Sequence, residues 1–301
     1  MKIKANGIDI EVEDTGPGSG AGARPVLLLI MGWGMQLVAW PPALVQGLVD
    51  AGFRVIRHDN RDIGLSQHFD HLGMPNLLWP FIKTKLRLSV KPAYSLGDMA
   101  ADSIGVLDAL GVGQAHLVGV SMGGMIAQRV ALLAPDRVAS LTSIMSTSGA
   151  RGLPEASLKL MRVLSRRPAS MARDDIVAHY IRLYQAIGSP GFPIPEADLR
   201  ERVLRAVTRS FHPAGAMRQG VAIAADTDIR AAELPHIRTP TLVLHGRDDP
   251  LVPYACGEDT ARRIPGARIV GIQGMGHDLA PGVVERLLPE LYPFLAHHRA
   301  A

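Results

Sequence analysis

Residues 116–125 read HLVGVSMGGM and place one serine, Ser121, between glycines at the end of an apolar run. Gly119, Ser121 and Gly123 form the pattern G-x-S-x-G, and Gly124 adds a further small residue. The residues before Ser121 predict a strand and those after it a helix, so the serine stands at a sharp strand-to-helix turn that demands small neighbours. Taken alone, the pattern also fits an ordinary glycine-rich turn. Whether Ser121 is a nucleophile therefore depends on whether the chain also supplies a base and an acid to activate it.

The rest of the chain alternates apolar runs of strand length with helical patterns. Apolar runs predict strands at 26–30, 53–60, 115–120, 138–147, 239–246 and 267–274. Helical patterns fall at about 41–50, 95–110, 122–135 and 282–296. The alternation predicts an α/β fold, with a mostly parallel sheet covered by helices on both faces. In such sheets ligands bind beyond the carboxyl ends of the strands, so we expect catalytic groups just after strands.

Residues 149–235 interrupt this alternation. They show four helical patterns and no clear strand, with prolines at the boundaries between them. The sequence therefore predicts one core built from residues 1–148 and 236–301. The block at 149–235 is expected to be a helical insertion over one end of the sheet.

Composition excludes several other classes of protein. The chain is 47% hydrophobic and 20% charged, which is typical of a globular protein with a buried core. The one basic cluster, at 83–91, is predicted to be a solvated loop or amphipathic segment, because no nucleic-acid-binding motif accompanies it. A single cysteine, Cys256, leaves no disulfide and no paired-cysteine metal or redox site. No apolar run approaches the ~18–20 residues that span a bilayer, and the N-terminus lacks a signal-peptide core. We expect a cytoplasmic protein without membrane insertion.

A serine hydroxyl becomes nucleophilic when a neighbouring base takes its proton and an acid orients that base. Among the histidines, His277 lies three residues past a predicted strand, in the glycine-rich loop GIQGMGHD, whereas His245 precedes a turn and favours a packing role. Asp248 and Asp249 follow another strand end, where an aspartate can also cap the next helix. Serine, aspartate, histidine is the chain order of strand–turn–helix serine hydrolases.

With these motifs in place, the chain resembles the α/β-hydrolase superfamily over nearly its whole length. GVSMGGM resembles the family's nucleophile elbow and GMGHD its histidine loop. HGRDDPLVP resembles the acid loop G-x-x-D-x-x-x-P, which selects Asp249 over Asp248. DNRDIGLS, at 59–66, resembles a structural loop that does not react. The block at 149–235 stands where the family inserts its cap.

One departure from the family pattern lies in the first strand–helix loop. This loop often reads His-Gly in the family and here reads IMGWG, at 30–34. Met-Gly at this point, followed by the Trp-Pro pair at 40–41, is similar to a bacterial subgroup that contains methylesterases acting on polyketides.

The resemblance implies a serine carboxylic-ester hydrolase that works through an acyl-enzyme on small to medium hydrophobic esters. His277 is expected to deprotonate Ser121 while Asp249 orients the imidazole. Backbone N–H groups of Trp33 and Met122 are expected to bind the oxyanion. This chemistry calls for no metal and no cofactor. The expected partner is a small-molecule ester, with no nucleic acid, and monomer and homodimer both stay open.

Met31, Met125 and Met275 are candidates for a hydrophobic substrate pocket, because methionine adapts to irregular apolar shapes; a plain core role fits them equally well. A proline iminopeptidase-like aminopeptidase is an alternative. It needs acidic cap residues such as Asp174 and Glu196, which helix capping also explains. Two further alternatives are a C–C bond or lactone hydrolase with the same triad, and a ligand receptor with negligible turnover. A serine at 121 excludes the dehalogenases and epoxide hydrolases of this fold, which carry aspartate there.

Overall fold

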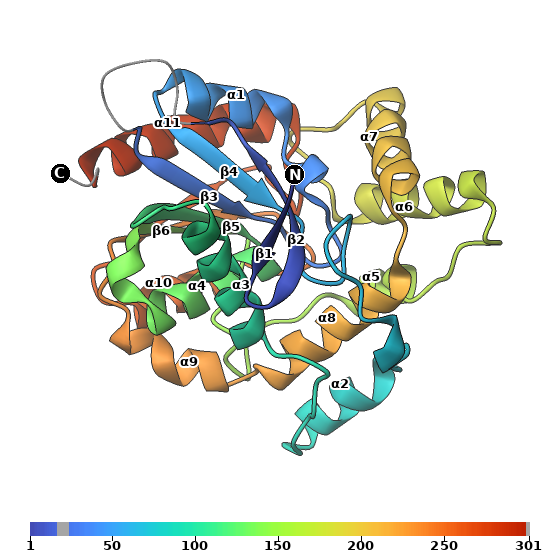
Figure 1. Cartoon of the computed structure of the whole chain (residues 1–301). Helices are drawn as coiled ribbons and strands as arrows, with labels where there is room; N and C mark the ends of the chain where they lie inside the picture. The colour runs from blue at the N-terminus through green and yellow to red at the C-terminus, as the bar shows by residue number, and fades with distance from the viewer. Residues whose placement is uncertain (17–23, 299–301) are drawn as a thin grey trace.

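A computed structural model of the chain describes residues 1–16 and 24–298. Its strands are β1 (Lys2–Ala5), β2 (Ile8–Asp14), β3 (Val26–Ile30), β4 (Arg54–His58), β5 (Ala115–Val120), β6 (Val138–Ile144), β7 (Thr241–Gly246) and β8 (Arg268–Ile272). In the described residues they form one sheet in the order β1-β2-β4-β3-β5-β6-β7-β8; Figure 1 labels β1 to β6. β1 and β2 pair as an antiparallel hairpin and β2 runs antiparallel to β4, while β3 to β8 form parallel pairs. The predicted mostly parallel sheet is confirmed.

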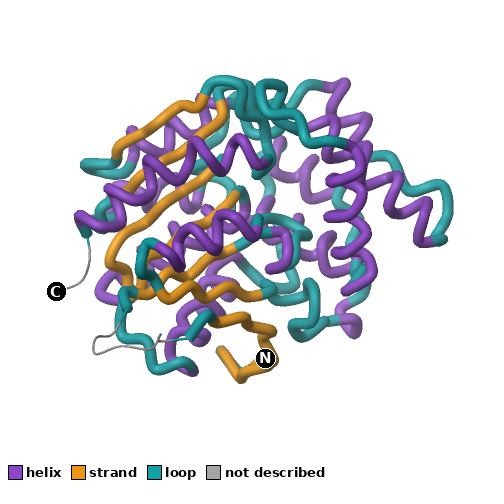
Figure 2. The backbone as a smooth tube through the Cα atoms, turned by 90° about the horizontal axis from the view of Figure 1, so that it is seen from above, coloured by secondary structure: helices purple, strands orange, loops and turns teal. Residues whose placement is uncertain are grey.

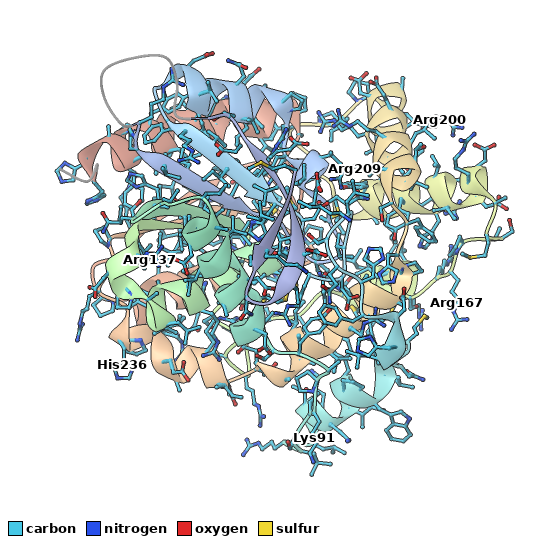
Figure 3. The ribbon with its side chains drawn as sticks, viewed as in Figure 1. Lys91, Arg137, Arg167, Arg200, Arg209 and His236 are labelled. Atoms are coloured by element: carbon cyan, nitrogen blue, oxygen red, sulfur yellow. The ribbon has the colours of Figure 1, made fainter. Side chains whose placement is uncertain are left out.

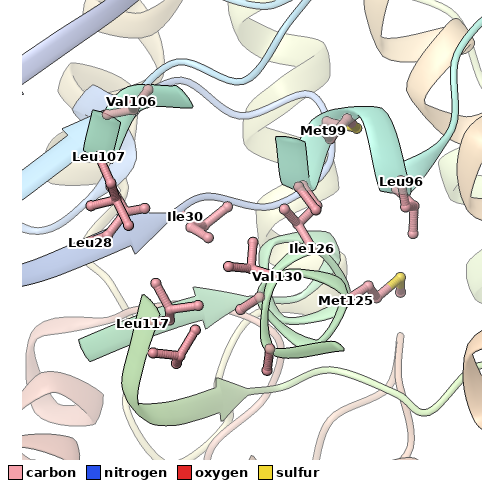
Figure 4. Close-up of a cluster of buried hydrophobic side chains, with 14 of the residues drawn as sticks. Leu28, Ile30, Leu96, Met99, Val106, Leu107, Leu117, Met125, Ile126 and Val130 are labelled. Atoms are coloured by element: carbon pink, nitrogen blue, oxygen red, sulfur yellow. The ribbon is translucent and has the colours of Figure 1, made fainter. Parts of the chain in front are cut away.

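Helices cover both faces of the sheet (Figure 2). The helices of the α/β part are α1 (Pro42–Asp50), α3 (Leu96–Ala109), α4 (Met122–Leu133), α10 (Tyr254–Arg263) and α11 (Pro281–His297). Side chains of β3 alternate between the faces: Leu28 and Ile30 pack with α3 and α4, and Leu27 and Leu29 pack with α1 and α11. Figure 4 shows the cluster on the α3–α4 side. Both faces are apolar, which explains the continuous apolar runs of the parallel strands.

The start of α3 shows how local sequence fixes an element. Ser95 Oγ accepts a hydrogen bond from the backbone N–H of Asp98 at 3.1 Å, and Asp98 Oδ2 accepts one from the backbone N–H of Ser95 at 2.7 Å. This capping box satisfies donors that the first turn of a helix leaves free. The spacing of these two residues in the sequence predicts it.

Residues 149–235 fold as helices between β6 and β7. They are α5 (Leu158–Leu164), α6 (Arg173–Ile187), α7 (Glu196–Arg209), α8 (Pro213–Ala225) and α9 (Ile229–Glu233). The structure therefore describes five helices in this block, where the sequence predicts four patterns. α6 and α7 pack against each other through their own apolar cluster, beyond the carboxyl ends of the strands (Figure 1).

A further helix, α2 (Leu78–Lys85), lies in the long connection between β4 and α3 and packs against α8. The sequence predicts only a loop or an amphipathic segment near this point. Short 3-10 turns occupy Leu37–Ala39, Asp70–Leu72, Pro135–Arg137 and Leu234–His236. In the described part of the chain, no helix is both long and apolar enough to cross a lipid bilayer.

Candidate active site

Ser121 stands between β5 and α4 with strained backbone, φ 55° and ψ −120°. A positive φ is unfavourable for residues other than glycine and persists only where the surroundings enforce it. Here the Ser121 N–H donates to the carbonyl of Ile144 at 2.9 Å, and Ser146 Oγ donates to the Ser121 carbonyl at 2.7 Å. These bonds tie both sides of the residue to β6 and the loop after it.

The glycines around Ser121 are required by close packing of backbone. A Cβ atom on Gly119 would lie 2.2 Å from the carbonyl oxygen of Gly123. A Cβ atom on Gly123 would lie 2.0 Å from the carbonyl oxygen of Ile30, on the neighbouring strand. Both distances are far below any van der Waals contact. The small residues of G-x-S-x-G therefore let α4 turn back tightly beside β5.

Three side chains from three separate strand ends meet at this turn. His277, after β8, has its Nε2 3.1 Å from Ser121 Oγ. Its Nδ1 lies 2.7 Å from Oδ2 of Asp249, which follows β7. Asp249 and His277 are 5% and 8% exposed, so water screens the contact between the two side chains only a little. The arrangement matches a nucleophile, a base and an orienting acid in line.

The two neighbouring aspartates have different partners. Asp249 Oδ1 accepts hydrogen bonds from the backbone N–H groups of Leu251 and Val252, at 2.9 and 2.8 Å, which leaves Oδ2 to the histidine. Asp248 Oδ2 instead accepts one from the N–H of Gly274 at 2.7 Å. Asp248 thus fastens the start of the loop that carries the histidine.

His245 lies beneath the acid loop. Its ring is buried, with Nε2 2.7 Å from the carbonyl oxygen of Val252 and 3.6 Å from Asp249 Oδ2. Burial lowers the pKa of His245, although the Asp249 carboxylate acts in the opposite direction. A neutral His245 supports the turn that presents Asp249, consistent with the packing role that the sequence favours.

The end of α6 holds the histidine loop from the other side. The N–H of His277 donates to the carbonyl of Ile187 at 2.7 Å. Ser189 Oγ accepts from the N–H of Gly276 at 2.9 Å and donates to the carboxyl group of Asp278. Burial raises the pKa of this carboxyl, and the Ser189 bond opposes the shift. Ser189 carries no signal in the sequence, because nothing in the helical block shows which loop a given residue contacts.

The loop after β3 lies directly against the serine. A Cβ atom on Gly32 would be 3.3 Å from Ser121 Cβ, and Asn60 Nδ2 donates to the carbonyl of Met31 at 2.8 Å. Trp33 is the next residue of this loop, and Met122 follows Ser121 as the first residue of α4. The supply of oxyanion donors by the backbone N–H groups of Trp33 and Met122 stays a prediction.

Helix α8 holds this loop through Gln219, a residue that no motif in the sequence marks. Gln219 is fully buried; its Oε1 accepts from the N–H of Gly34 at 2.9 Å, and its Nε2 donates to the carbonyl of Arg61 at 2.9 Å. The Trp33 indole N–H donates to the carbonyl of Ala216, also on α8, at 2.5 Å. One helix turn thus holds the loop 32–34 at two points.

The loop 59–66 has the structural role that the sequence suggests. Asp59 is buried and accepts hydrogen bonds from the N–H groups of Leu37 and Leu65, at 2.7 and 2.9 Å. Arg209 reaches it from α7 at 2.7 Å (Figure 3). Burial raises the pKa of Asp59, and Arg209 opposes the shift. The carboxylate joins the loop after β3, the loop after β4 and α7.

The three methionines proposed for a substrate pocket are buried in the core. Met31 and Met275 pack in the cluster under α1 and α11, and Met125 packs in the cluster under α3 and α4. This packing matches the core role that their sequence positions also allow. A pocket role stays a prediction.

One cluster has the residue types of a metal site. Potential ligand atoms of His68, Asp70 and His212 all lie within 4.8 Å of one another. The two imidazole rings are stacked, with centroids 3.8 Å apart and planes 7° from parallel. A metal ion must lie near the plane of each ligating ring, which two parallel rings do not permit together. The donor geometry therefore does not fit a metal ion.

The chain is similar to a known family and to several proteins within it. A family model described as the alpha/beta hydrolase fold matches residues 25–280. Rhodomycin D methylesterase DnrP of Streptomyces peucetius is 31% identical, covering 94% of each chain. A pimeloyl-[acyl-carrier protein] methyl ester esterase of Aliivibrio salmonicida is 26% identical, covering 89% of this chain and 91% of the esterase.

Two solved structures extend the comparison. A thermophilic esterase from Thermogutta terrifontis has a TM-score of 0.67 and 26% identity, with complete coverage of both chains. A meta-cleavage product hydrolase from Pseudomonas fluorescens has a TM-score of 0.71 and 19% identity, covering 99% of this chain and 97% of the hydrolase. Because the meta-cleavage product hydrolase is only 19% identical, its similarity supports the fold and not the activity.

Proposed function

This chain belongs to the α/β-hydrolase family, and we propose that it is a serine carboxylic-ester hydrolase acting through an acyl-enzyme on small to medium hydrophobic esters. The observation that carries the proposal is the hydrogen-bonded series Asp249, His277 and Ser121, with distances of 2.7 and 3.1 Å. Relatives named as methyl esterases support ester hydrolysis and make a methyl ester the first substrate to test.

The proposed reaction has two half-reactions. His277 Nε2 takes the proton of Ser121 as Oγ bonds to the ester carbonyl carbon, while Asp249 stabilises the imidazolium. The tetrahedral oxyanion accepts hydrogen bonds from the N–H groups of Trp33 and Met122. His277 then protonates the departing alcohol, which leaves an acyl group on Ser121. Water, deprotonated by His277, attacks this acyl-enzyme and releases the acid.

In this proposal, residues 149–235 form a cap that helps to build the site. Ser189 holds the histidine loop, and Gln219 holds the loop 32–34, hereafter the oxyanion loop, so both loops depend on contacts from the helical block. Such contacts fix reacting groups in place before substrate arrives, which lowers the cost of reaching the transition state.

The buried Gln219 gives a specific prediction. Gln219→Leu removes the acceptor for Gly34 N–H and the donor to Arg61, so the oxyanion loop loosens. We expect kcat to fall about 10–100-fold with little change in KM, because the lost interaction acts mainly in the transition state. Gln219→Glu keeps the acceptor and should recover part of kcat. Steady-state kinetics with p-nitrophenyl acetate measure both variants.

The exposed Gln46→Leu on α1 serves as the matched control and should leave kcat unchanged. A Gln219→Leu enzyme with normal kcat, or one in which KM rises and kcat stays the same, would contradict the positioning role. Thermal unfolding of each variant separates loss of fold from loss of loop geometry.

A substrate panel tests the proposed reaction class. We expect p-nitrophenyl acetate, p-nitrophenyl butyrate and aromatic methyl esters to be hydrolysed faster than p-nitrophenyl palmitate, with little release from a proline arylamide. Faster release from the proline arylamide would favour an aminopeptidase instead. Preferential cleavage of a lactone or of a C–C bond between carbonyl groups would favour the corresponding hydrolases of this fold.

A further inference from the structure

Helix α2 and the residues on either side of it expose many large apolar side chains. The exposed fraction of the residue lies between 44% and 64% at positions 72, 74, 78, 79, 81, 86 and 88. The highest values are 62% for Leu78, 62% for Trp79 and 64% for Leu86. Single exposed apolar residues are normal on a protein surface. A continuous group of them marks an interaction site.

The packing of α2 fixes which side faces outward. Thr84 Oγ1 lies 3.4 Å from the carbonyl oxygen of Ala224 on α8, and a Cβ atom on Gly220 would lie 2.9 Å from Leu77 Cδ2. Positions 77 and 84 are seven residues apart and share this inner face. Helical periodicity places Trp79 and the C-cap residue Leu86 on the opposite face, where they are 62% and 64% exposed, and the exposed Lys83 on the flank between the two faces. Figure 1 shows α2 at the edge of the molecule, beyond α8.

Charge on this segment has one sign. Residues 71–97 contain the cations Lys83, Lys85, Arg87 and Lys91 and no aspartate or glutamate. Lys85 forms an ion pair with the exposed Glu155. Lys91 projects from the lower edge of the molecule beside α2 (Figure 3). The cations alternate with exposed leucines, so the surface is apolar and basic together.

This combination selects among possible partners. A second copy of the chain would bring two basic surfaces together, which like-charge repulsion disfavours. An acidic protein would complement the positive charge. It would not explain why leucine and tryptophan side chains are exposed beside the cations. An anionic lipid surface complements both features, because apolar side chains enter the acyl boundary while lysine and arginine stay at the phosphate level.

We propose that the outward face of residues 78–91, hereafter the α2 surface, docks on an anionic phospholipid bilayer. Attachment is peripheral: Trp79 and Leu86 enter the interface, and Lys83 and Arg87 contact lipid phosphates. Helix α8 packs against α2 and also holds the oxyanion loop through Gln219. If the proposed esterase function holds, docking brings the site close to amphiphilic esters dissolved in the membrane.

Vesicle co-sedimentation tests the docking directly. The full chain should bind phosphatidylcholine vesicles that contain phosphatidylglycerol and bind pure phosphatidylcholine vesicles far more weakly, with binding that falls as salt rises. Lys83→Glu/Arg87→Glu should weaken binding by at least about tenfold, since each basic residue near an anionic surface contributes severalfold to affinity. Tryptophan fluorescence should shift to shorter wavelength on binding, and Trp79→Phe should remove most of that shift.

The matched control is Lys2→Glu/Arg286→Glu, which reverses two exposed charges on β1 and α11, away from α2. It should bind as the unaltered chain does, and all these variants should hydrolyse p-nitrophenyl acetate normally. Equal binding to neutral vesicles, an equal loss in the control, or a dimer that Trp79→Ser dissociates would overturn the proposal. Ser121→Ala should still bind vesicles, so failure of docking and failure of the esterase mechanism are distinguishable.

Discussion

Replacing Ser121 with alanine is expected to lower kcat for p-nitrophenyl acetate by about 10⁶-fold, to the residual rate that binding and the oxyanion donors alone support. Alanine keeps the Cβ atom and removes only Oγ, the atom 3.1 Å from His277 Nε2. Backbone strain at this position is the same for both residues, so the fold should persist. Burst and steady-state kinetics measure the loss, and thermal unfolding checks that the protein is intact.

Ser165→Ala provides the control, because it removes an exposed serine hydroxyl at the end of α5. It should retain the activity of the unaltered chain. Turnover by Ser121→Ala close to that of the unaltered chain would exclude Ser121 as the nucleophile, whatever the behaviour of the other variants.

Asp249→Asn is expected to lower kcat by about 10⁴-fold. Asparagine Oδ1 can still accept the N–H bonds of Leu251 and Val252, so its side-chain NH₂ faces His277 Nδ1. The imidazole then carries its proton on Nε2 and cannot accept the serine proton. The fold should be preserved, because the loop keeps its backbone bonds. The pH dependence of kcat and thermal unfolding together measure this variant.

Asp248→Asn is the matched control next to it in the chain. Its amide oxygen can still accept from Gly274 N–H, and no contact joins position 248 to the imidazole. We expect kcat to stay within about tenfold of the unaltered value, as for other residues that act only by supporting a loop. A larger loss at 248 than at 249 would contradict the assignment of the acid.

The sheet and the meeting of Ser121, Asp249 and His277 could be predicted from the sequence because their signals are local. Each side chain lies in a short motif just after an apolar run, and parallel strands bring such ends to one edge of the sheet. The pattern G-x-S-x-G has an equally local cause, since a Cβ atom on Gly119 or Gly123 would collide with backbone.

Other features depend on contacts between distant segments, and the sequence does not reveal them. Gln219 and Ser189 reach loops more than 85 positions away in the chain, at Arg61 and Asp278. Helical periodicity predicts which residues share a face but not which loop that face meets. The short helix α2 gives a weak signal because Pro80 lies within it and because apolar side chains such as Trp79 stay exposed on its outer face, which blurs the helical pattern.

Mass spectrometry of the acylated enzyme tests the central claim most directly. The protein is mixed with p-nitrophenyl acetate, quenched with acid within one turnover and digested, and the peptide that contains Ser121 is sequenced in the spectrometer. We predict one acetyl group on Ser121, which disappears when the quench is delayed until substrate is exhausted and never forms in Ser121→Ala. Product release with no acyl group on Ser121 at any time, or an acyl group on another residue that turns over at the rate of catalysis, would contradict the account.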